Sequence, residues 1–522
     1  MSVWSVRELV PGAVAKQPLF GSIESKRRPG RGAAGFRDFA SGSPRSGYPL
    51  CGKPIVHAVA TGAVESSHAS ARRDLVGRES LGALILAGSL PFLFFHERYQ
   101  PELEVGVGST TVDVRLSDLA VVVVLAAAAF AASRTGLARL GAARWLWIAG
   151  VVLLGWLAFQ TFRPVSLDDA LFADHLVSYL KFVEYGLLAV AVPLLVRRAD
   201  DLTIVLGGLV LWAAVAVSVA LLQFFGADIF GAWNAGWRQP SFLGHHDLAA
   251  LSAIALALAA SAVAARRREI PAPRLFVAAL VVGTLGLILA GSVAAVGGLA
   301  VGVVALFLAA RRRFRTGGRQ TLALVAIVAV VAGGVTAVRG DALEDFLRFL
   351  GVRGDEPPVG VETYSQRAVL AYIGLRIAQD NPIVGVGWQR SSRPEVFEPY
   401  VPDARERFPD VVGLAFPAEG REWGVQSLYI QMLADAGVIG LALLLFVGGA
   451  GAFLAWRTAT RAPTPWAAGA GLVTVCALLT IAGEWASLGI VAGIPLQAAT
   501  CILLGLAAAG AAATEPARVP PR

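Results

Sequence analysis

Three short stretches of the sequence together contain arginine, histidine and acidic side chains. Side chains of these types could bind an anion and move a proton. The first holds Arg238 and the run His245-His246-Asp247, which opens an apolar segment. A guanidinium group can bind phosphate through two parallel hydrogen bonds, and a helix amino-terminus adds partial positive charge. We interpret Arg238, His245 and His246 as an anion site; the alternative is an interfacial anchor followed by a helix cap.

The second stretch carries Arg367 on a predicted helix over residues 365–380, which ends at Asn381-Pro382 and a Gly-Val-Gly turn. The helix has one apolar stripe, so it could lie on the surface of the outer leaflet. Because a planar guanidinium suits phosphate, we interpret Arg367 as a second contact to an anionic lipid headgroup. The alternative is a solvated flank of a surface helix.

The third stretch contains Gln426, Ser427 and Asp435 at the start of a long apolar segment. These polar groups could face an aqueous cleft. The alternative is ordinary helix capping, with Gly437 and Gly440 packing against neighbouring helices. The spacing of the residues leaves both interpretations open.

Apolar segments of about twenty residues position these stretches. Hydrophobic residues are 56% of the chain and charged residues 16%, whereas soluble proteins carry about 25% charge. A helix needs roughly 20 apolar residues to cross the hydrocarbon core, and backbone amides in lipid need partners within the segment. We predict an all-α polytopic membrane protein of about twelve transmembrane helices. The predicted spans are 80–97, 117–133, 145–162, 177–196, 202–225, 244–265, 274–291, 293–310, 320–338, 427–455, 466–484 and 487–510.

The links between these spans alternate in charge. Five links on one side hold sixteen arginines, and the short links between them hold four. Positive charge stays on the cytoplasmic side during insertion, so we predict a multi-pass plasma-membrane protein with both termini cytoplasmic. The chain has a net charge of +8; we expect its positive charge to be concentrated on the cytoplasmic side, where it meets anionic headgroups rather than nucleic acid.

The same pattern divides the chain into five parts. Residues 1–79 form a disordered Arg/Gly/Ser-rich cytoplasmic tail, 80–338 hold nine spans, 339–426 form one large external loop with short helices, 427–510 hold three spans, and 511–522 form a second tail. The three cysteines are scattered and form no metal pattern. We expect neither a metal nor a cofactor.

Four motifs together carry a resemblance. From Arg367 the helix reads Arg-x-x-x-Ala-Tyr-Ile-Gly, and the turn after it reads Asp-Asn-Pro-Ile-Val-Gly-Val-Gly. Residues 427–440 read Ser-Leu-Tyr-Ile-Gln-Met-Leu-Ala-Asp-Ala-Gly-Val-Ile-Gly, and residues 244–250 read Gly-His-His-Asp-Leu-Ala-Ala. These motifs resemble the O-antigen ligase and polymerase family of polytopic membrane proteins, which shares the layout of many spans and one large, late periplasmic loop.

The resemblance implies a metal-free transferase. It would move a glycan from undecaprenyl or a similar polyprenyl diphosphate to a glycan or lipid acceptor at the outer face of the membrane. In the family, arginines hold the diphosphate, which needs neutralising charge, and a loop histidine takes the proton of the acceptor hydroxyl. Arg238 and Arg367 look like the family's arginine positions. Here Gln426-Ser427 stands where the family has His-Asn, and the large loop contains no histidine.

Glu422, Asp435 and His246 are the candidates for the missing base. We favour Glu422, which lies four residues before Gln426. The predicted catalytic residues are thus Glu422, Gln426 and Asp435, and Ser427 is expected to help orient the acceptor. The substrate-binding residues expected besides Ser427 are Arg238, His245, His246 and Arg367.

Two other functions remain open. A transporter of a lipid-linked or anionic solute would need charged groups within spans, and Lys181 and Glu184 could form such a pair because they lie three residues apart. An inactive family member could instead support cell-envelope assembly. The expected partners are the lipid-linked glycan donor, the acceptor and membrane lipids, with no nucleic acid.

Overall fold

The computed structural model describes residues 80–107, 110–163, 170–265, 272–314, 316–340, 363–490 and 493–514, with residues 270 and 344. The predicted tail at 1–79, the second tail from residue 515 and part of the large loop lie outside the described residues.

Eleven helices in the described part of the chain are long and apolar enough to cross a membrane. They confirm the predicted all-α polytopic membrane protein. They are α3 (Leu116–Thr135), α4 (Arg144–Phe162), α5 (Ala170–Leu195), α6 (Ala199–Phe224), α7 (His245–Ala265), α8 (Phe276–Ala290), α9 (Val293–Phe314), α10 (Gly318–Val338), α15 (Leu428–Arg461), α16 (Pro465–Glu484) and α17 (Pro495–Ala512). The 3₁₀ turns η3 (Ala138–Ala143) and η5 (Pro273–Leu275) precede α4 and α8.

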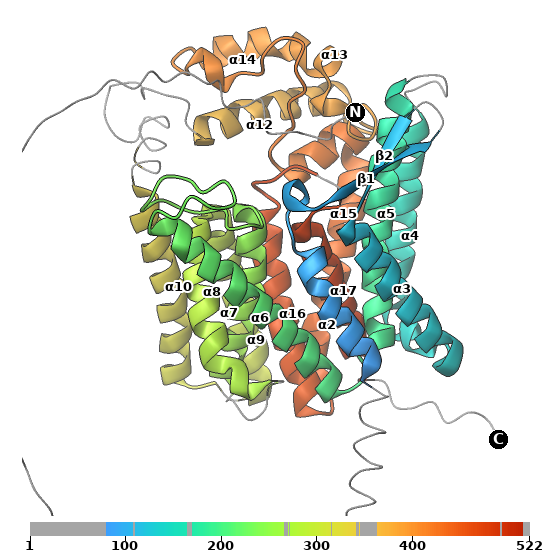
Figure 1. Cartoon of the computed structure of the whole chain (residues 1–522), viewed down its shortest axis with the longest axis vertical. Coiled ribbons are helices and arrows are strands. Elements are labelled where there is room, and N and C mark those ends of the chain that lie inside the picture. The colour runs from blue at the N-terminus through green and yellow to red at the C-terminus, as the bar shows by residue number, and fades with distance from the viewer. Residues whose placement is uncertain are drawn as a thin grey trace, which may run out of the picture. The chain divides into compact units, whose positions relative to one another are not determined.

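The first predicted span is shorter than expected. Helix α2 (Leu81–Leu93) has 13 residues, or about 20 Å at 1.5 Å per residue, less than the roughly 30 Å of a hydrocarbon core. After it the chain forms the 3₁₀ turn η2 (Glu97–Tyr99) and an antiparallel hairpin of β1 (Glu102–Val107) and β2 (Thr110–Arg115). The hairpin lies at the same end of the long helices as the large loop (Figure 1).

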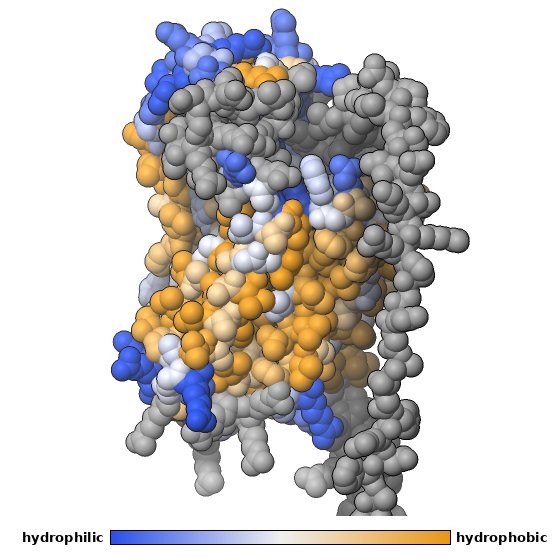
Figure 2. Space-filling model, turned by 90° about the vertical axis from the view of Figure 1, so that its left-hand side faces the viewer, coloured by the Kyte–Doolittle hydropathy of each residue, from blue (hydrophilic) through white to orange (hydrophobic). Residues whose placement is uncertain are grey.

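Small residues let the central helices approach closely. Helices α7, α16 and α17 are almost entirely buried. Between α9 and α16, a Cβ added at Gly298 or Gly302 would lie 2.5 or 2.6 Å from a backbone oxygen of α16, which is the small-residue packing expected between membrane helices. Apolar side chains form a belt across the middle of the face in Figure 2, with hydrophilic residues above and below it.

The described part of the large loop folds into short helices packed against the bundle. They are α12 (Thr363–Asp380), α13 (Pro394–Phe397) and α14 (Val401–Arg407), with 3₁₀ turns η6 (Arg390–Ser392), η7 (Glu398–Tyr400) and η8 (Gly413–Ala415). They lie together at one end of the long helices (Figure 1). The apolar stripe Val369, Ile373 and Ile377 of α12 is buried against Phe397 and Ala434. The stripe therefore faces protein, and the expectation that it lies on the outer leaflet is wrong.

Candidate functional site

A chain of polar contacts joins the large loop to two buried spans. On α12, an outer nitrogen of the Arg367 guanidinium lies 3.2 Å from Nε2 of His246 on α7, and the Arg367 Nε donates to Oε1 of Gln426 at 2.9 Å. On the other side of the ring, Nδ1 of His246 lies 3.1 Å from Oε2 of Glu484 on α16. Four side chains thus form one continuous path from the loop into the bundle.

The inner half of this path is buried among apolar helices. His246 is 8% exposed and Glu484 is 0% exposed. A carboxylate in such surroundings is costly unless it is paired, and Oε2 of Glu484 also accepts from the Ser487 hydroxyl at 3.2 Å. Because arginine can only donate, Nε2 of His246 presents its lone pair to Arg367 and Nδ1 carries its proton toward Glu484.

Arg238, in the loop between α6 and α7, is linked to the same histidines through the ring of Trp233. Its guanidinium carbon lies 4.5 Å from the centroid of the Trp233 ring, and the Trp233 ring packs on His245 at 5.2 Å between centroids. The His245 and His246 rings are 3.9 Å apart. The structure therefore brings Arg238 and Arg367, from two separate segments, to one histidine pair.

A third arginine joins this cluster, and the sequence interpretation did not single it out. Arg339 follows α10 and is 7% exposed, and it donates to the Gly291 carbonyl at 3.2 Å. A Cβ at Gly291 would lie 2.8 Å from Cβ of Arg238 and 3.2 Å from Cδ of Arg339, so both side chains pack at this glycine. The charges of Arg238, Arg339 and Arg367 all act on His245. The sequence signal for Arg339 is its position: it is an arginine at the end of a predicted span, on the side of the membrane where the short links contain few arginines.

Asp435 lies in a different set of contacts. It is 0% exposed; its Oδ1 accepts from the backbone N–H of Ser391 at 2.8 Å, and its Oδ2 accepts from that of Gln389 at 3.2 Å. Both carboxylate oxygens therefore hold the turn after α12. None of the described hydrogen bonds links Asp435 to the arginine–histidine cluster.

Two motif glycines lock the same turn onto α15. Gly437 interrupts α15 with φ +68°, and a Cβ there would lie 2.1 Å from the carbonyl oxygen of Ile383. Gly385 has φ +69°, and its Cβ would lie 2.4 Å from the carbonyl oxygen of Asp435. Positive φ favours glycine, and neither position has room for a side chain. The second and third motifs are thus two halves of one backbone contact, which we call the glycine lock (Gly385 and Gly437).

The two remaining predicted site residues, Ser427 and Glu422, lie in different surroundings. Ser427 is 7% exposed at the start of α15, next to Gln426, and makes no side-chain capping bond. Glu422 is on the surface, with its side chain 44% exposed, and forms an ion pair with Arg393. Among the described contacts, Ser427 thus lies beside the Arg367 partner, whereas Glu422 belongs to a surface ion pair.

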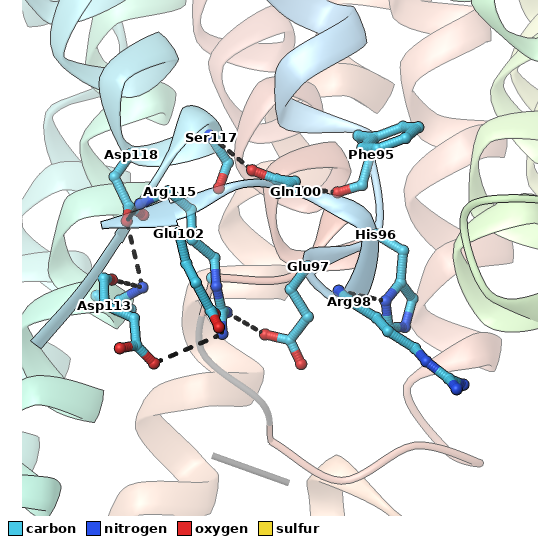
Figure 3. Close-up of polar contacts among 12 residues, drawn as sticks. Phe95, His96, Glu97, Arg98, Gln100, Glu102, Asp113, Arg115, Ser117 and Asp118 are labelled. Atoms are coloured by element: carbon cyan, nitrogen blue, oxygen red, sulfur yellow. Dashed lines mark hydrogen bonds and ion pairs between the residues drawn. The ribbon is translucent and has the colours of Figure 1, made fainter. Parts of the chain in front are cut away.

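The expected pair of Lys181 with Glu184 is not among the described ion pairs. Lys181 instead lies 3.3 Å from the Asp118 carboxylate, because β2 leads directly into α3 and places Asp118 beside α5. Next to it, carboxylates of the hairpin and η2 gather around Arg115 (Figure 3). His96 lies at the edge of this group, and burial lowers the pKa of His96.

Among the described residues, no group of three or more His, Cys, Asp or Glu side chains could hold a metal ion. The arrangement instead offers guanidinium groups for an anion, with a histidine between a carboxylate and one of those groups.

Residues 278–445 match the family model described as O-antigen ligase. The match starts in α8 and ends in α15, so it includes Arg367 and both halves of the glycine lock, while His246 and Glu484 lie outside it. A comparison with curated proteins found no match. The motif resemblance and the matched segment agree, and both support membership of this multi-pass membrane protein in the O-antigen ligase family of membrane glycan-transfer proteins, which act on lipid-linked glycans.

Proposed function

We propose that the chain transfers a glycan from a polyprenyl diphosphate to a glycan or lipid acceptor at the outer face of the plasma membrane. The observation that carries this proposal is that Arg367 contacts His246, while Arg238 lies over Trp233, whose ring packs on the neighbouring His245. From the arginine distribution we expect the end of the bundle that holds this site to face the outside.

The two guanidinium groups suit a diphosphate in both ground and transition states. Each can donate two parallel hydrogen bonds to phosphate oxygens. When the bond between the sugar and the diphosphate breaks, the diphosphate gains negative charge, which nearby cations stabilise strongly in a site of low dielectric constant. In this proposal Arg238 and Arg367 bind the diphosphate, and Gln426 and Ser427 orient the acceptor.

The test uses a cell that lacks its native copy and carries Arg238→Ala together with Arg367→Ala. We expect loss of the attached or extended surface glycan, seen on a gel, at an unchanged level of the protein in the membrane. Arg376→Ala is a matched control, because Arg376 lies on the same helix but pairs with the exposed Asp403. Wild-type glycan length and attachment in the double variant would refute the proposal. Movement of labelled lipid-linked glycan across proteoliposomes without any transfer would favour a transporter.

A further inference from the structure

We propose that Nε2 of His246 is the general base that takes the proton of the acceptor hydroxyl, and that Glu484 positions its ring. This inference rests on the proposed function and names the base that the large loop lacks. The geometry that points to it is the contact of one imidazole with the buried Glu484 carboxylate through Nδ1 and with the Arg367 guanidinium through Nε2.

The carboxylate fixes which nitrogen can act. With the Nδ1 proton directed to Glu484 at 3.1 Å, the lone pair of Nε2 faces the large loop, where Gln426 also contacts Arg367. A carboxylate in this position holds the tautomer and stabilises the imidazolium that forms when Nε2 gains a proton. It also gives a reason for a fully buried glutamate inside α16, since such a group costs free energy without a partner.

The other candidates are less suited to take a proton. Gln426 has no basic group, and both oxygens of Asp435 accept backbone hydrogen bonds. Glu422 is exposed and paired with Arg393. His245 stacks on His246, but none of the described hydrogen bonds ties its ring to a carboxylate.

The contact between Arg367 and His246 also sets an order of events. In this structure the guanidinium covers the Nε2 lone pair. Charged phosphate oxygens accept hydrogen bonds from arginine more strongly than a neutral nitrogen does, so a bound diphosphate draws Arg367 away from His246. The base is thereby exposed only after the donor has bound.

The transfer step then balances. The acceptor O–H proton moves to Nε2 of His246 while the acceptor oxygen bonds to the anomeric carbon of the donor sugar. The bond from that carbon to the diphosphate breaks, and its electron pair leaves with the polyprenyl diphosphate, which Arg238 and Arg367 neutralise. The proton on His246 passes to solvent or to the diphosphate when the product leaves.

The experiment uses the purified full chain in detergent, with lipid-linked glycan and acceptor extracted from cells that lack the protein. Undecaprenyl diphosphate serves as the binding probe. For His246→Asn we expect kcat to fall roughly 100-fold to 10,000-fold, the usual range for loss of a general base, with probe affinity changed less than about threefold. For Glu484→Gln we expect a smaller fall in kcat at nearly constant KM, and Glu484→Asp should restore part of it.

Thr480→Val is the matched control, because Thr480 is buried one turn earlier on α16 and its hydroxyl bonds within its own helix. Wild-type kcat in His246→Asn, with transfer still lost in the arginine variants, would overturn this inference and leave the proposed function standing. Loss of probe binding in His246→Asn would make His246 a binding residue and overturn its role as base. Failure of the wild-type chain to bind the probe or transfer glycan would count against the proposed function itself.

Discussion

Replacing Asp435 by asparagine should loosen the turn after α12, although none of the described hydrogen bonds joins Asp435 itself to the arginine–histidine cluster. The carboxylate accepts backbone hydrogen bonds from Ser391 and Gln389 at 2.8 and 3.2 Å, and it is fully buried. Asparagine offers one acceptor oxygen and one donor group. Its oxygen can keep one of the two bonds, but its NH₂ group then faces the second N–H.

The size of the effect follows from these two bonds. A hydrogen bond to a charged group is worth about 1.5–3 kcal/mol, and a buried donor left without a partner costs about 1–3 kcal/mol. We therefore expect the turn to lose about 2–4 kcal/mol of local stability. Since every 1.4 kcal/mol is a factor of ten in an equilibrium, the population of the opened turn should rise roughly 30-fold to 700-fold.

Amide hydrogen exchange of the purified protein measures this opening directly. Peptides covering residues 385–391 should exchange faster by the same factor in Asp435→Asn. Asp403→Asn is the control. Like Asp435, Asp403 accepts two hydrogen bonds, here from the side chains of Arg376 and Tyr372, but its own side chain is 42% exposed. Exposed ion pairs are worth at most about 1 kcal/mol, so this substitution should have little effect on exchange at 385–391. Unchanged exchange at 385–391 together with abolished glycan transfer would refute this reasoning and give Asp435 a role in the chemistry.

Two further predictions concern the glycine lock and the topology. Gly437→Ala should prevent recovery of folded protein after detergent extraction, because the added Cβ would overlap a backbone carbonyl. Gly448→Ala in the same helix should be recovered at wild-type level, since nothing lies within 4 Å of a Cβ added there. Equal recovery of the two variants would contradict the glycine lock. Single cysteines replacing the exposed Glu406 and Arg313 should react with a membrane-impermeant maleimide in intact cells only at position 406, measured with Cys51 replaced by serine. Reaction at position 313 instead would invert the predicted orientation.

The long helices could be predicted because their signal is local. An apolar run of sufficient length specifies a spanning helix, and α12 has its own apolar stripe and terminating Asn-Pro. The hairpin was overlooked although residues 102–107 alternate polar and apolar side chains, which is the period of a strand. The early end of α2 was also not predicted, since its apolar residues continue to Phe95.

The site could be predicted only in part, because its contacts join distant residues. Arg238 and Arg367 were expected to meet over one cavity; in the structure Arg367 contacts His246, and Arg238 lies over Trp233, which packs on His245. Glu484 is not among the predicted site residues, although a lone acidic residue in an apolar run is a functional signal in membrane proteins. Its partner His246 lies 238 residues away in the chain. Nothing in the spacing of Asp435 indicated that its oxygens bind backbone amides of the large loop.

The glycine lock, formed by one glycine from each of two motifs, suggests a structural role for the large loop that neither motif indicates alone. It holds the end of α12 against α15, and Arg367 lies about 20 Å from that end at 1.5 Å per residue. Gly374, two turns after Arg367 on the same face, lets α12 approach Val425 closely, with an added Cβ at 2.9 Å. Since a helix fixed at two points has little freedom to tilt, Arg367 is held at His246. Asp435 and Gly437 of the third motif therefore act by placing the Arg367 guanidinium beside His246.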